Sequence, residues 1–194
     1  MATYLKEFWT DKRILFLSFA FIAYCLTIAL TPHHASTWLA AGAGVLFFFI
    51  LEYFTHRFIL HGFLARFVKK AFQGHVEHHN DPDNLLYMLT PNSYNVPLHV
   101  LFTAIFCLVT QSLHLGAAVM LGTTLYQLYY EWTHLVSHRP IVPATNIGKN
   151  RKKLHLLHHY KSDQLWFGVT NVTFDNVAGT NPPTGHVPKD KISM

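Results

Sequence analysis

Two long stretches of the sequence contain no charged side chain, and charged segments flank both. No Asp, Glu, Lys or Arg occurs from Ile14 to Leu51, or from Asn84 to Tyr130. About 20 apolar residues cross a bilayer as a helix, and a charge at the helix centre costs roughly 2.5 to 3.5 kcal/mol on insertion scales. Each stretch has room for two crossings, so the pattern predicts four transmembrane helices in two hairpins.

Polar residues inside each stretch indicate where the helices end. The first hairpin is expected to turn through residues 31–36, which include a Pro and several polar residues, and the second through residues 110–116. Asn95 is expected to cap the first helix of the second hairpin, with Pro97 in its first turn. The sequence therefore predicts an all-α fold, an integral membrane four-helix bundle formed by a single domain over residues 1–194. The predicted spans are residues 14–30, 37–51, 96–109 and 117–130.

The positions of the cations predict the orientation of this bundle. Of the 15 Lys and Arg residues, three precede the first hairpin, four lie between the hairpins and eight follow the second. An even number of crossings places these segments and both termini on one face, which the positive-inside rule makes cytoplasmic. Because the cations flank membrane spans, the net charge of +5 indicates attraction to anionic headgroups rather than nucleic-acid binding.

Ten of the 15 histidines form four groups, each close to the end of an uncharged stretch, with the spacings H-x4-H, H-x2-H-H, H-x3-H and H-x2-H-H. Neutral imidazole is a common ligand of zinc, copper and iron, and residues three or four apart share a helix face. Ten ligands suffice for two ions, so we expect a helical cap with a dinuclear metal site on the cytoplasmic face. The expected ligands are His56, His61, His75, His78, His79, His134, His138, His155, His158 and His159. The isolated histidines, expected to be hydrogen-bonded bystanders, are His33, His34, His99, His114 and His186.

Two questions about these groups stay open. His134 and His138 share a helix face, whereas His56 and His61 diverge by about 140° on an ideal helix. The second pair therefore reaches two different metals, or a local distortion realigns it. Each half of the chain also repeats one plan, an uncharged hairpin followed by five grouped histidines, and either a duplication or a shared ligand geometry explains the repeat.

Neutral imidazoles leave the charge of two metal ions uncompensated, so nearby carboxylates are candidates for hydrogen bonds to the ligands. An ordinary solvated or helix-capping role is the alternative for each carboxylate. The candidates are Glu52, Glu77, Glu131, Asp163 and Asp175.

The four histidine groups, in this order, resemble the fatty acid hydroxylase and sterol desaturase superfamily of integral-membrane di-metal oxygenases. The similarity covers roughly residues 52–180 and includes the stretch from His56 to His61, the stretch His75 to Asn80, and the tail Phe167-Gly168-Val169-Thr170. The resemblance implies two Fe ions, held by the ten grouped histidines, with no catalytic residue beyond the metal centre. Such a centre uses O2 to hydroxylate a C–H bond of a lipid, which for this family is a fatty acid or fatty acyl chain. Zinc can replace iron in a purified sample.

The resemblance also implies partners. Thirteen residues before the first span cannot hold a fused cytochrome b5-like domain, so we expect a separate reductase, ferredoxin or cytochrome as electron donor. The basic region from Lys149 to Lys153 is a candidate docking face for that donor, with lipid headgroups as the alternative. A carotenoid or sterol hydroxylase or desaturase of the same superfamily is the alternative enzyme. A membrane metal-binding or transport protein needs ionisable groups along its path, and the predicted spans offer only His99 and His114.

Overall fold

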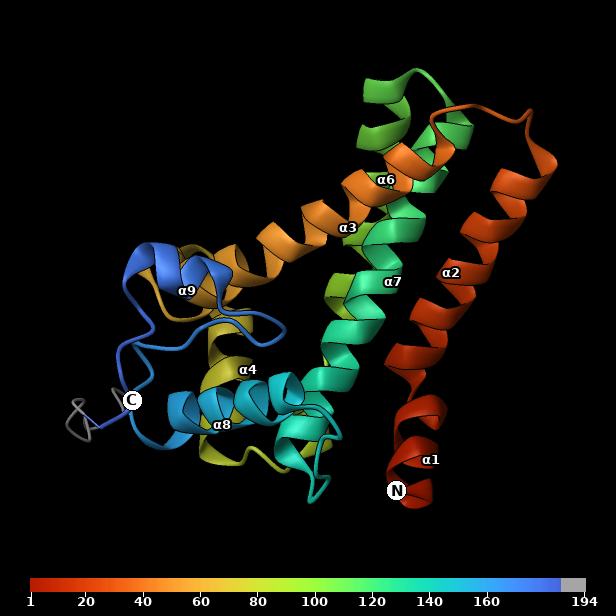
Figure 1. Ribbon diagram of the computed structural model, residues 1–194. Helices are drawn as coiled ribbons and strands as arrows, with labels where there is room; N and C mark the ends of the chain where they lie inside the picture. Colours follow the sequence, from red (N-terminus) through yellow and green to blue (C-terminus); the bar gives the residue numbers. More distant parts are fainter. Residues whose placement is uncertain (186–194) are drawn as a thin grey trace. The chain divides into compact units, whose positions relative to one another are not determined.

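The computed structural model describes residues 1–185, and within them the chain forms helices joined by loops, the connection between α8 and α9 being an extended one (Figure 1). The all-α prediction is confirmed, since no strand occurs among the described residues. His186 lies outside the described residues. The α-helices are α1 (Ala2–Thr10), α2 (Lys12–Leu30), α3 (Thr37–Phe54), α4 (Lys69–Asn80), α5 (Leu85–Met88), α6 (Asn92–Thr110), α7 (Leu113–His138), α8 (Asn146–Tyr160) and α9 (Thr173–Ala178). A π-helical turn, η1 (Thr55–Leu60), and a 3₁₀-helix, η2 (Phe63–Phe67), follow α3.

The chain divides into two compact units, each built from two separate segments of sequence. Unit 1 comprises residues 1–50 and 90–131, and unit 2 comprises residues 51–89 with the described residues from Trp132 onward. Both halves of the sequence therefore contribute to both units. A single domain over the whole chain stays a prediction.

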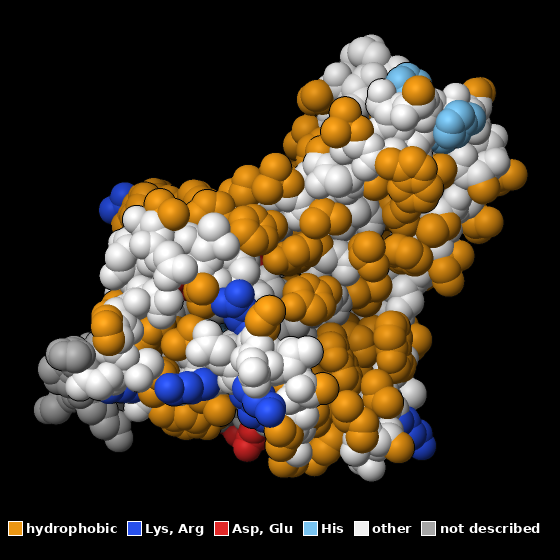
Figure 2. Space-filling view, in the orientation of Figure 1, with side chains coloured by type: hydrophobic (Ala, Val, Ile, Leu, Met, Phe, Trp, Pro, Cys, Tyr) orange, Lys and Arg blue, Asp and Glu red, His pale blue; other side chains and the backbone are white. Residues whose placement is uncertain are grey.

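Three stretches of helix in the described residues are long and apolar enough to cross a membrane, namely Lys12–Leu30, Thr37–Leu60 and Leu85–Thr110. Large hydrophobic side chains remain exposed on them: Phe19 of α2 is 71% exposed and Leu108 of α6 is 69% exposed. Hydrophobic side chains also cover much of the molecular surface seen in Figure 2. These helices indicate an integral membrane protein.

The fourth predicted span, residues 117–130, lies inside α7, and α7 is not among the helices apolar enough to cross a membrane by composition. The physical reason is its burial. Thr123, Thr124 and Gln127 are buried polar residues of α7, and they make hydrogen bonds to α3, to the preceding turn of α7 and to α6 respectively. Because these side chains are not exposed to lipid, α7 does not need the apolar composition of a lipid-facing helix.

The first hairpin matches its predicted bounds closely, whereas the second does not. α6 begins at Asn92, with Pro91 as its N-cap, and only Gln111 and Ser112 separate it from α7. The prediction of Asn95 as the cap and of a turn over residues 110–116 is wrong. Asn95 lies inside the helix because its side-chain amide is satisfied there, donating to the Thr90 carbonyl and accepting from Gln127 Nε2.

Buried and half-buried polar side chains join the helices of unit 1. The Tyr24 hydroxyl of α2 contacts Thr103 Oγ1 of α6 at 2.8 Å, and His99 Nε2 of α6 contacts Gln127 Oε1 of α7 at 3.0 Å. His114 uses both ring nitrogens, toward Thr31 Oγ1 and Thr37 Oγ1, each at 2.7 Å. These bonds confirm the bystander prediction for His99 and His114, which fix the packing of the helices.

Glycines set the contact between α3 and α7. A Cβ atom on Gly44 would overlap the backbone at Val119, and one on Gly122 would overlap the backbone at Ala41. The two backbones therefore touch at these positions, as small residues allow in membrane proteins. A Cβ on Gly42 would meet nothing within 4 Å.

This contact predicts a difference between two glycine substitutions. Gly122→Val should lower stability by about 1 to 3 kcal/mol or more, because the helices have to separate to admit the side chain. Gly42→Ala should leave stability unchanged or slightly higher, because the site is open. Thermal unfolding of the purified protein in detergent measures both. Equal midpoints for the two variants would show that the helices do not pack at Gly122.

Candidate metal centre

The π-helical turn η1 answers the question of how His56 and His61 are oriented. The His61 amide donates to the His56 carbonyl over 3.1 Å, an i to i+5 bond in place of the usual i to i+4 bond. This wider turn carries residue i+5 back toward the face of residue i. The two rings lie 5.1 Å apart between centroids, so a local distortion directs both histidines to one place.

The two H-x2-H-H motifs each divide between two sites. In α4, His75 and His79 are four residues apart and lie in one group, whereas His78 lies in the second group. In α8, His155 and His159 lie in the second group, whereas His158 lies in the first. The resulting groups have five imidazoles each. Group A contains His56, His61, His75, His79 and His158. Group B contains His78, His134, His138, His155 and His159.

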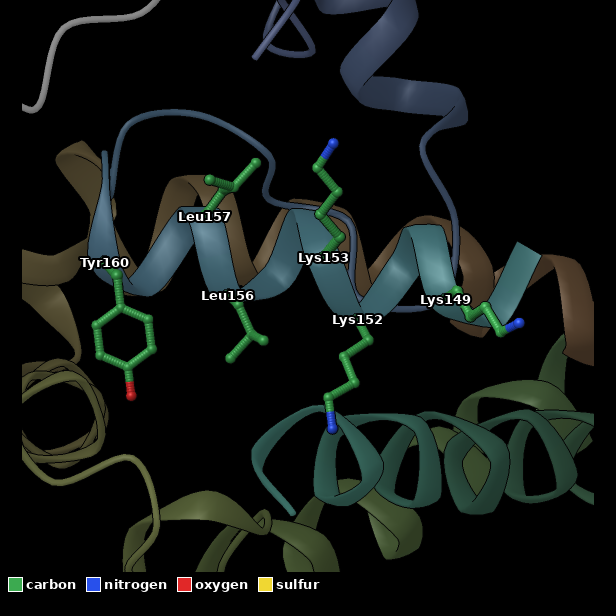
Figure 3. Close-up of a pocket in the computed structure, with 6 residues that line it drawn as sticks. All are labelled: Lys149, Lys152, Lys153, Leu156, Leu157 and Tyr160. Atoms are coloured by element: carbon green, nitrogen blue, oxygen red, sulfur yellow. The ribbon is translucent and has the colours of Figure 1, made fainter. Parts of the chain in front are cut away.

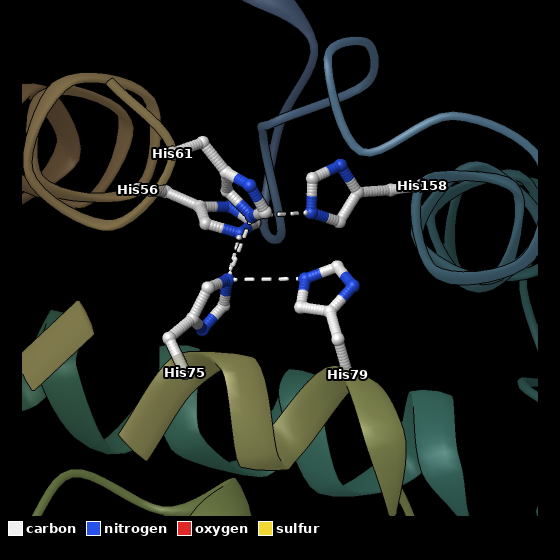
Figure 4. Close-up of side chains that lie close together, drawn as sticks. All are labelled: His56, His61, His75, His79 and His158. Carbon is white, nitrogen blue, oxygen red and sulfur yellow. Dashed lines mark hydrogen bonds between the residues drawn. The ribbon is translucent and has the colours of Figure 1, made fainter. Parts of the chain in front are cut away.

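The Nε2 atoms of group A converge from three directions (Figure 4). His75 Nε2 lies 2.7 Å from His61 Nε2, 3.2 Å from His56 Nε2 and 3.1 Å from His79 Nε2. His158 Nε2 reaches from α8 to within 3.0 Å of His61 Nε2. Five nitrogens with lone pairs available for coordination thus surround one position.

Group B is similar and more deeply buried. His78 Nε2 lies 3.0 Å from His134 Nε2, and His138 Nε2 lies 2.8 Å from His155 Nε2. All five residues are buried, whereas His61, His75 and His79 of group A are half-buried. His159 Nε2 has no hydrogen-bond partner among the described residues, although it is buried. A buried polar atom without a partner is costly, so this nitrogen fits a group that binds a metal ion.

The spacing of the nitrogens fits metal ions. Imidazole nitrogens about 2.1 Å from one ion lie roughly 3.0 Å apart when adjacent in an octahedral arrangement and about 4.2 Å apart when opposite. Within each group all five candidate ligand atoms lie within 4.8 Å of one another. The groups also adjoin, since the rings of His79 and His159 stack with centroids 4.1 Å apart. The two groups therefore suggest a dimetal site.

Backbone carbonyls fix two rings of group A. His56 Nδ1 donates to the Phe167 carbonyl at 2.5 Å, and His158 Nδ1 donates to the Leu165 carbonyl at 2.8 Å. A ring that donates through Nδ1 keeps its lone pair on Nε2, the atom that faces the group. The loop between α8 and α9 thus selects the tautomer needed for metal binding.

Two buried carboxylates hold this loop. Glu52 accepts from the Thr170 amide at 3.2 Å and the Thr170 hydroxyl at 2.7 Å. Asp175 accepts from the Phe167 and Gly168 amides at 3.0 and 2.8 Å, and from the Thr180 hydroxyl. These acids therefore act on the histidines indirectly, through the backbone that carries the two carbonyls.

The other acidic candidates have different surroundings. Asp163 is buried, and its charge raises the pKa of His79 relative to the effect of burial alone. Glu77 is exposed on α4, and Glu131 belongs to unit 1, where it accepts from the Thr90 amide at 3.2 Å. Among the described residues, no hydrogen bond or ion pair joins Glu77 to either histidine group.

Sequence reasoning did not identify the carbonyls of Leu165 and Phe167 as partners of the ligands. Backbone groups carry no residue signature, and the only sequence signal for them is the Phe167 to Thr170 tail. It also missed Lys152, whose ammonium donates to three carbonyls, those of Val136 and Ile141 at 2.9 Å and that of Arg139 at 2.5 Å. These bonds close the end of α7 against α8, which fixes His138 relative to His155.

Burial lowers the pKa of the grouped histidines that lie outside the membrane-spanning helices. The pKa of His79 falls from its ordinary value of 6.5 to about 4. Burial and then the neighbouring rings lower the pKa of His155 and His159 further. The rings are therefore neutral at pH 7, as metal ligation requires.

These shifts predict how the metal-free protein responds to pH. Below pH 6.5 the unfolded chain takes up protons that the folded His79 resists until about pH 4, so stability must fall as pH falls through this window. We expect the unfolding midpoint of the chelator-treated protein to drop steadily as the pH is lowered. A flat or rising midpoint would contradict neutral, buried rings. The exposed His34→Ala variant should retain the same profile.

Helix α8 provides a matched pair of lysines, Lys152 and Lys153. Lys152 points toward α7, whereas Lys153 points the opposite way and is exposed (Figure 3). Lys152→Met should lower stability by about 1 to 3 kcal/mol, because it leaves three carbonyls without their donor. Lys153→Met should have little effect. Chemical unfolding of both variants measures the difference, and equal stabilities would show that Lys152 does not close α7.

Comparison with known proteins places this geometry in a family. The family model described as fatty acid hydroxylase matches residues 41–180, well over half of the chain. The chain is 29% identical over 149 residues to dihydroceramide fatty acyl 2-hydroxylase FAH1 of Arabidopsis thaliana, covering 73% of this chain and 60% of that protein. It is 31% identical over 145 residues to FAH2 of the same plant, covering 72% and 59%. The chain therefore spans about three fifths of the length of these relatives.

The mouse fatty acid 2-hydroxylase is 26% identical over 153 residues, covering 75% of this chain and 40% of that protein. A solved structure described as full-length scs7p, with only the hydroxylase domain visible, has a TM-score of 0.75 and 24% identity, and the match covers 92% of this chain and 67% of that one. The structural likeness shows a shared fold. With the family match over residues 41–180, the chain belongs to the fatty acid hydroxylase family.

Proposed function

We propose that the protein is a membrane-bound di-iron oxygenase that hydroxylates a C–H bond of a fatty acyl chain. The reaction consumes one O2, two electrons and two protons, and yields the alcohol and one water. One observation carries the proposal: two adjoining groups of five imidazoles, with Nε2 atoms 2.7 to 3.2 Å apart, in a chain of the fatty acid hydroxylase family.

The ten histidines of groups A and B would hold two iron ions, and iron when bound supplies the activation of O2. The protein itself keeps the ligand nitrogens neutral and directs them toward the position that each ion would occupy. Burial keeps the rings unprotonated, and the carbonyls of Leu165 and Phe167 fix the Nδ1–H tautomers of His158 and His56. Zinc in a purified sample would occupy the same nitrogens without supporting the oxidation.

The difference in burial between the groups supports a direction of approach for the substrate. All members of group B are buried, which excludes water from that side. Three members of group A are half-buried, so the reacting carbon reaches the centre past His61, His75 and His79. Water exclusion on the group B side limits wasteful reduction of O2.

The names of the relatives support a choice of substrate. FAH1 is described as a dihydroceramide fatty acyl 2-hydroxylase, and the mouse relative as a fatty acid 2-hydroxylase. We therefore propose the acyl chain of a sphingolipid as the substrate and carbon 2 as the position oxidised. The polar amide next to that carbon would stay at the membrane surface while the chain lies in the bilayer.

We further propose four crossings, with α7 as the fourth, and both termini and the metal centre on the cytoplasmic side. The distribution of Lys and Arg supports this orientation. A separate reductase, ferredoxin or cytochrome would deliver electrons at the outer face of α8. There Lys149 and Lys153 are exposed for an acidic partner, whereas Lys152 is engaged with carbonyls.

The test is a comparison of lipids from cells that express the chain together with an electron-donor system. Mass spectrometry should find an added oxygen on carbon 2 of sphingolipid acyl chains for the intact protein. The His78→Ala, His158→Ala double variant removes one ligand from each group and should lose at least about 99% of this product.

The matched control is the His33→Ala, His34→Ala double variant, which changes two exposed histidines outside both groups. It should hydroxylate as well as the intact protein. Unchanged lipids at full metal loading would favour a metal-binding or transport role. Loss of two hydrogens, or oxidation confined to sterols or carotenoids, would favour the rival enzymes of the superfamily.

A further inference from the structure

The segment from Phe54 to Lys70, which contains η1 and η2, has features that the metal centre does not require. We propose that this segment is a membrane-interface anchor that binds an anionic lipid surface, with Phe63 and Phe67 inserted among the acyl chains. The proposal concerns unit 2 alone, and the anchor does not depend on the identity of the metal or of the substrate.

Exposed aromatic rings are the first observation. Phe63 is 65% exposed and Phe67 is 70% exposed, both on the short helix η2. Phe54, in the apolar stretch Thr37–Leu60, is itself 44% exposed. Exposing such rings to water is unfavourable, and a membrane-length helix ends three residues before Phe63.

The aromatic rings form a continuous path from the span to η2. The centroids of Phe54 and Phe58 lie 5.2 Å apart, and those of Phe58 and Phe63 lie 6.2 Å apart. Phe58 therefore links the apolar side chains at the end of the span to η2. A bilayer that covers Phe54 extends to Phe63 along this path.

Charge selects the kind of lipid. No Asp or Glu occurs between Glu52 and Glu77, whereas the segment carries four cations, Arg57, Arg66, Lys69 and Lys70. The last three are exposed, and among the described residues none of them forms an ion pair. The Arg66 guanidinium lies 4.8 Å from the centre of the Phe67 ring, which holds a cation beside an inserting aromatic. Aromatic rings flanked by unpaired cations are typical of segments that lie in an anionic interface.

The anchor has a consequence for the metal centre that rests on the proposed function. His61 lies between Phe58 and Phe63 in the sequence, and it belongs to the less buried group A. Fixing the depth of these phenylalanines in the bilayer fixes the depth of His61. An acyl chain that leaves the bilayer beside the anchor would reach group A over a short path.

Brominated lipids test the anchor directly. Phe67→Trp replaces one exposed aromatic by another, and Val142→Trp is the control, because Val142 is 80% exposed in the loop between α7 and α8, outside the segment. Each full-length variant is reconstituted in nanodiscs of phosphatidylglycerol, with and without bromine on the acyl chains. The signal of the native tryptophans is subtracted using the unsubstituted protein.

We expect bromine to quench at least half of the fluorescence added by Phe67→Trp and at least twofold less of that added by Val142→Trp. Equal quenching of the two would overturn the proposal, as would quenching of the Phe67→Trp indole by aqueous iodide instead. Protection of that indole from both bromine and iodide would also overturn it, since it would mean that protein covers the segment.

A charge variant tests whether the cations of the segment bind anionic headgroups, apart from insertion of the aromatic rings. The triple change Arg66→Gln, Lys69→Gln, Lys70→Gln in the Phe67→Trp background should remove the difference in quenching between phosphatidylglycerol and phosphatidylcholine discs. An unchanged preference for phosphatidylglycerol would show that these cations do not select the lipid. Metal content, measured on every variant, distinguishes a failed anchor from a failed metal centre: the anchor variants should keep the metal loading of the unsubstituted protein.

Discussion

The structure of unit 2 depends on ten imidazole nitrogens directed at two adjoining positions, five at each. Uncharged nitrogens held 2.7 to 3.2 Å apart share too few protons to satisfy one another, and His159 Nε2 has no partner among the described residues. A cation at each position would coordinate these nitrogens and satisfy their lone pairs. The local features of unit 2 serve that requirement: the π-helical turn aligns His56 with His61, and α4 and α8 each supply ligands to both positions.

The orientation of two imidazole rings also depends on hydrogen bonds made by Nδ1, the nitrogen that faces away from the group. A loop between α8 and α9 presents the carbonyls of Leu165 and Phe167 to His158 and His56, and the buried acids Glu52 and Asp175 hold that loop by its amides and hydroxyls. The two buried carboxyl groups therefore act on the histidines one step removed, through the backbone of this loop. This arrangement leaves the metal-facing positions free for other ligands and keeps the imidazole tautomers fixed.

The sequence predicted the features that depend on residue type alone. Charge-free stretches located the first hairpin within a few residues, and the spacing of ten histidines identified the candidate metal centre. It could not predict features that depend on packing. α7 carries Gln127 and two buried threonines because it faces other helices, so it lacks the composition of a span, and Asn95 is drawn into α6 by its bond to Gln127. The π-helical turn is one such feature. Another is that His78 and His158 each belong to a different group from their neighbours in the same motif, which depends on the paths of η1, α4 and α8 in three dimensions. Spacing alone does not specify those paths. Proximity in sequence is also a poor guide to contact, since Glu131 was a candidate only because it is close in sequence to His134.

X-ray absorption spectroscopy of the iron-loaded protein tests the central claim most directly, because it reports the ligands of each ion without a crystal. The account predicts two ions per chain in a nitrogen-dominated shell, with about five ligands per ion at roughly 2.1 Å and the strong outer-shell scattering of imidazole rings. A single ion per chain, or a shell dominated by sulfur or by carboxylate oxygen with weak imidazole scattering, would contradict it.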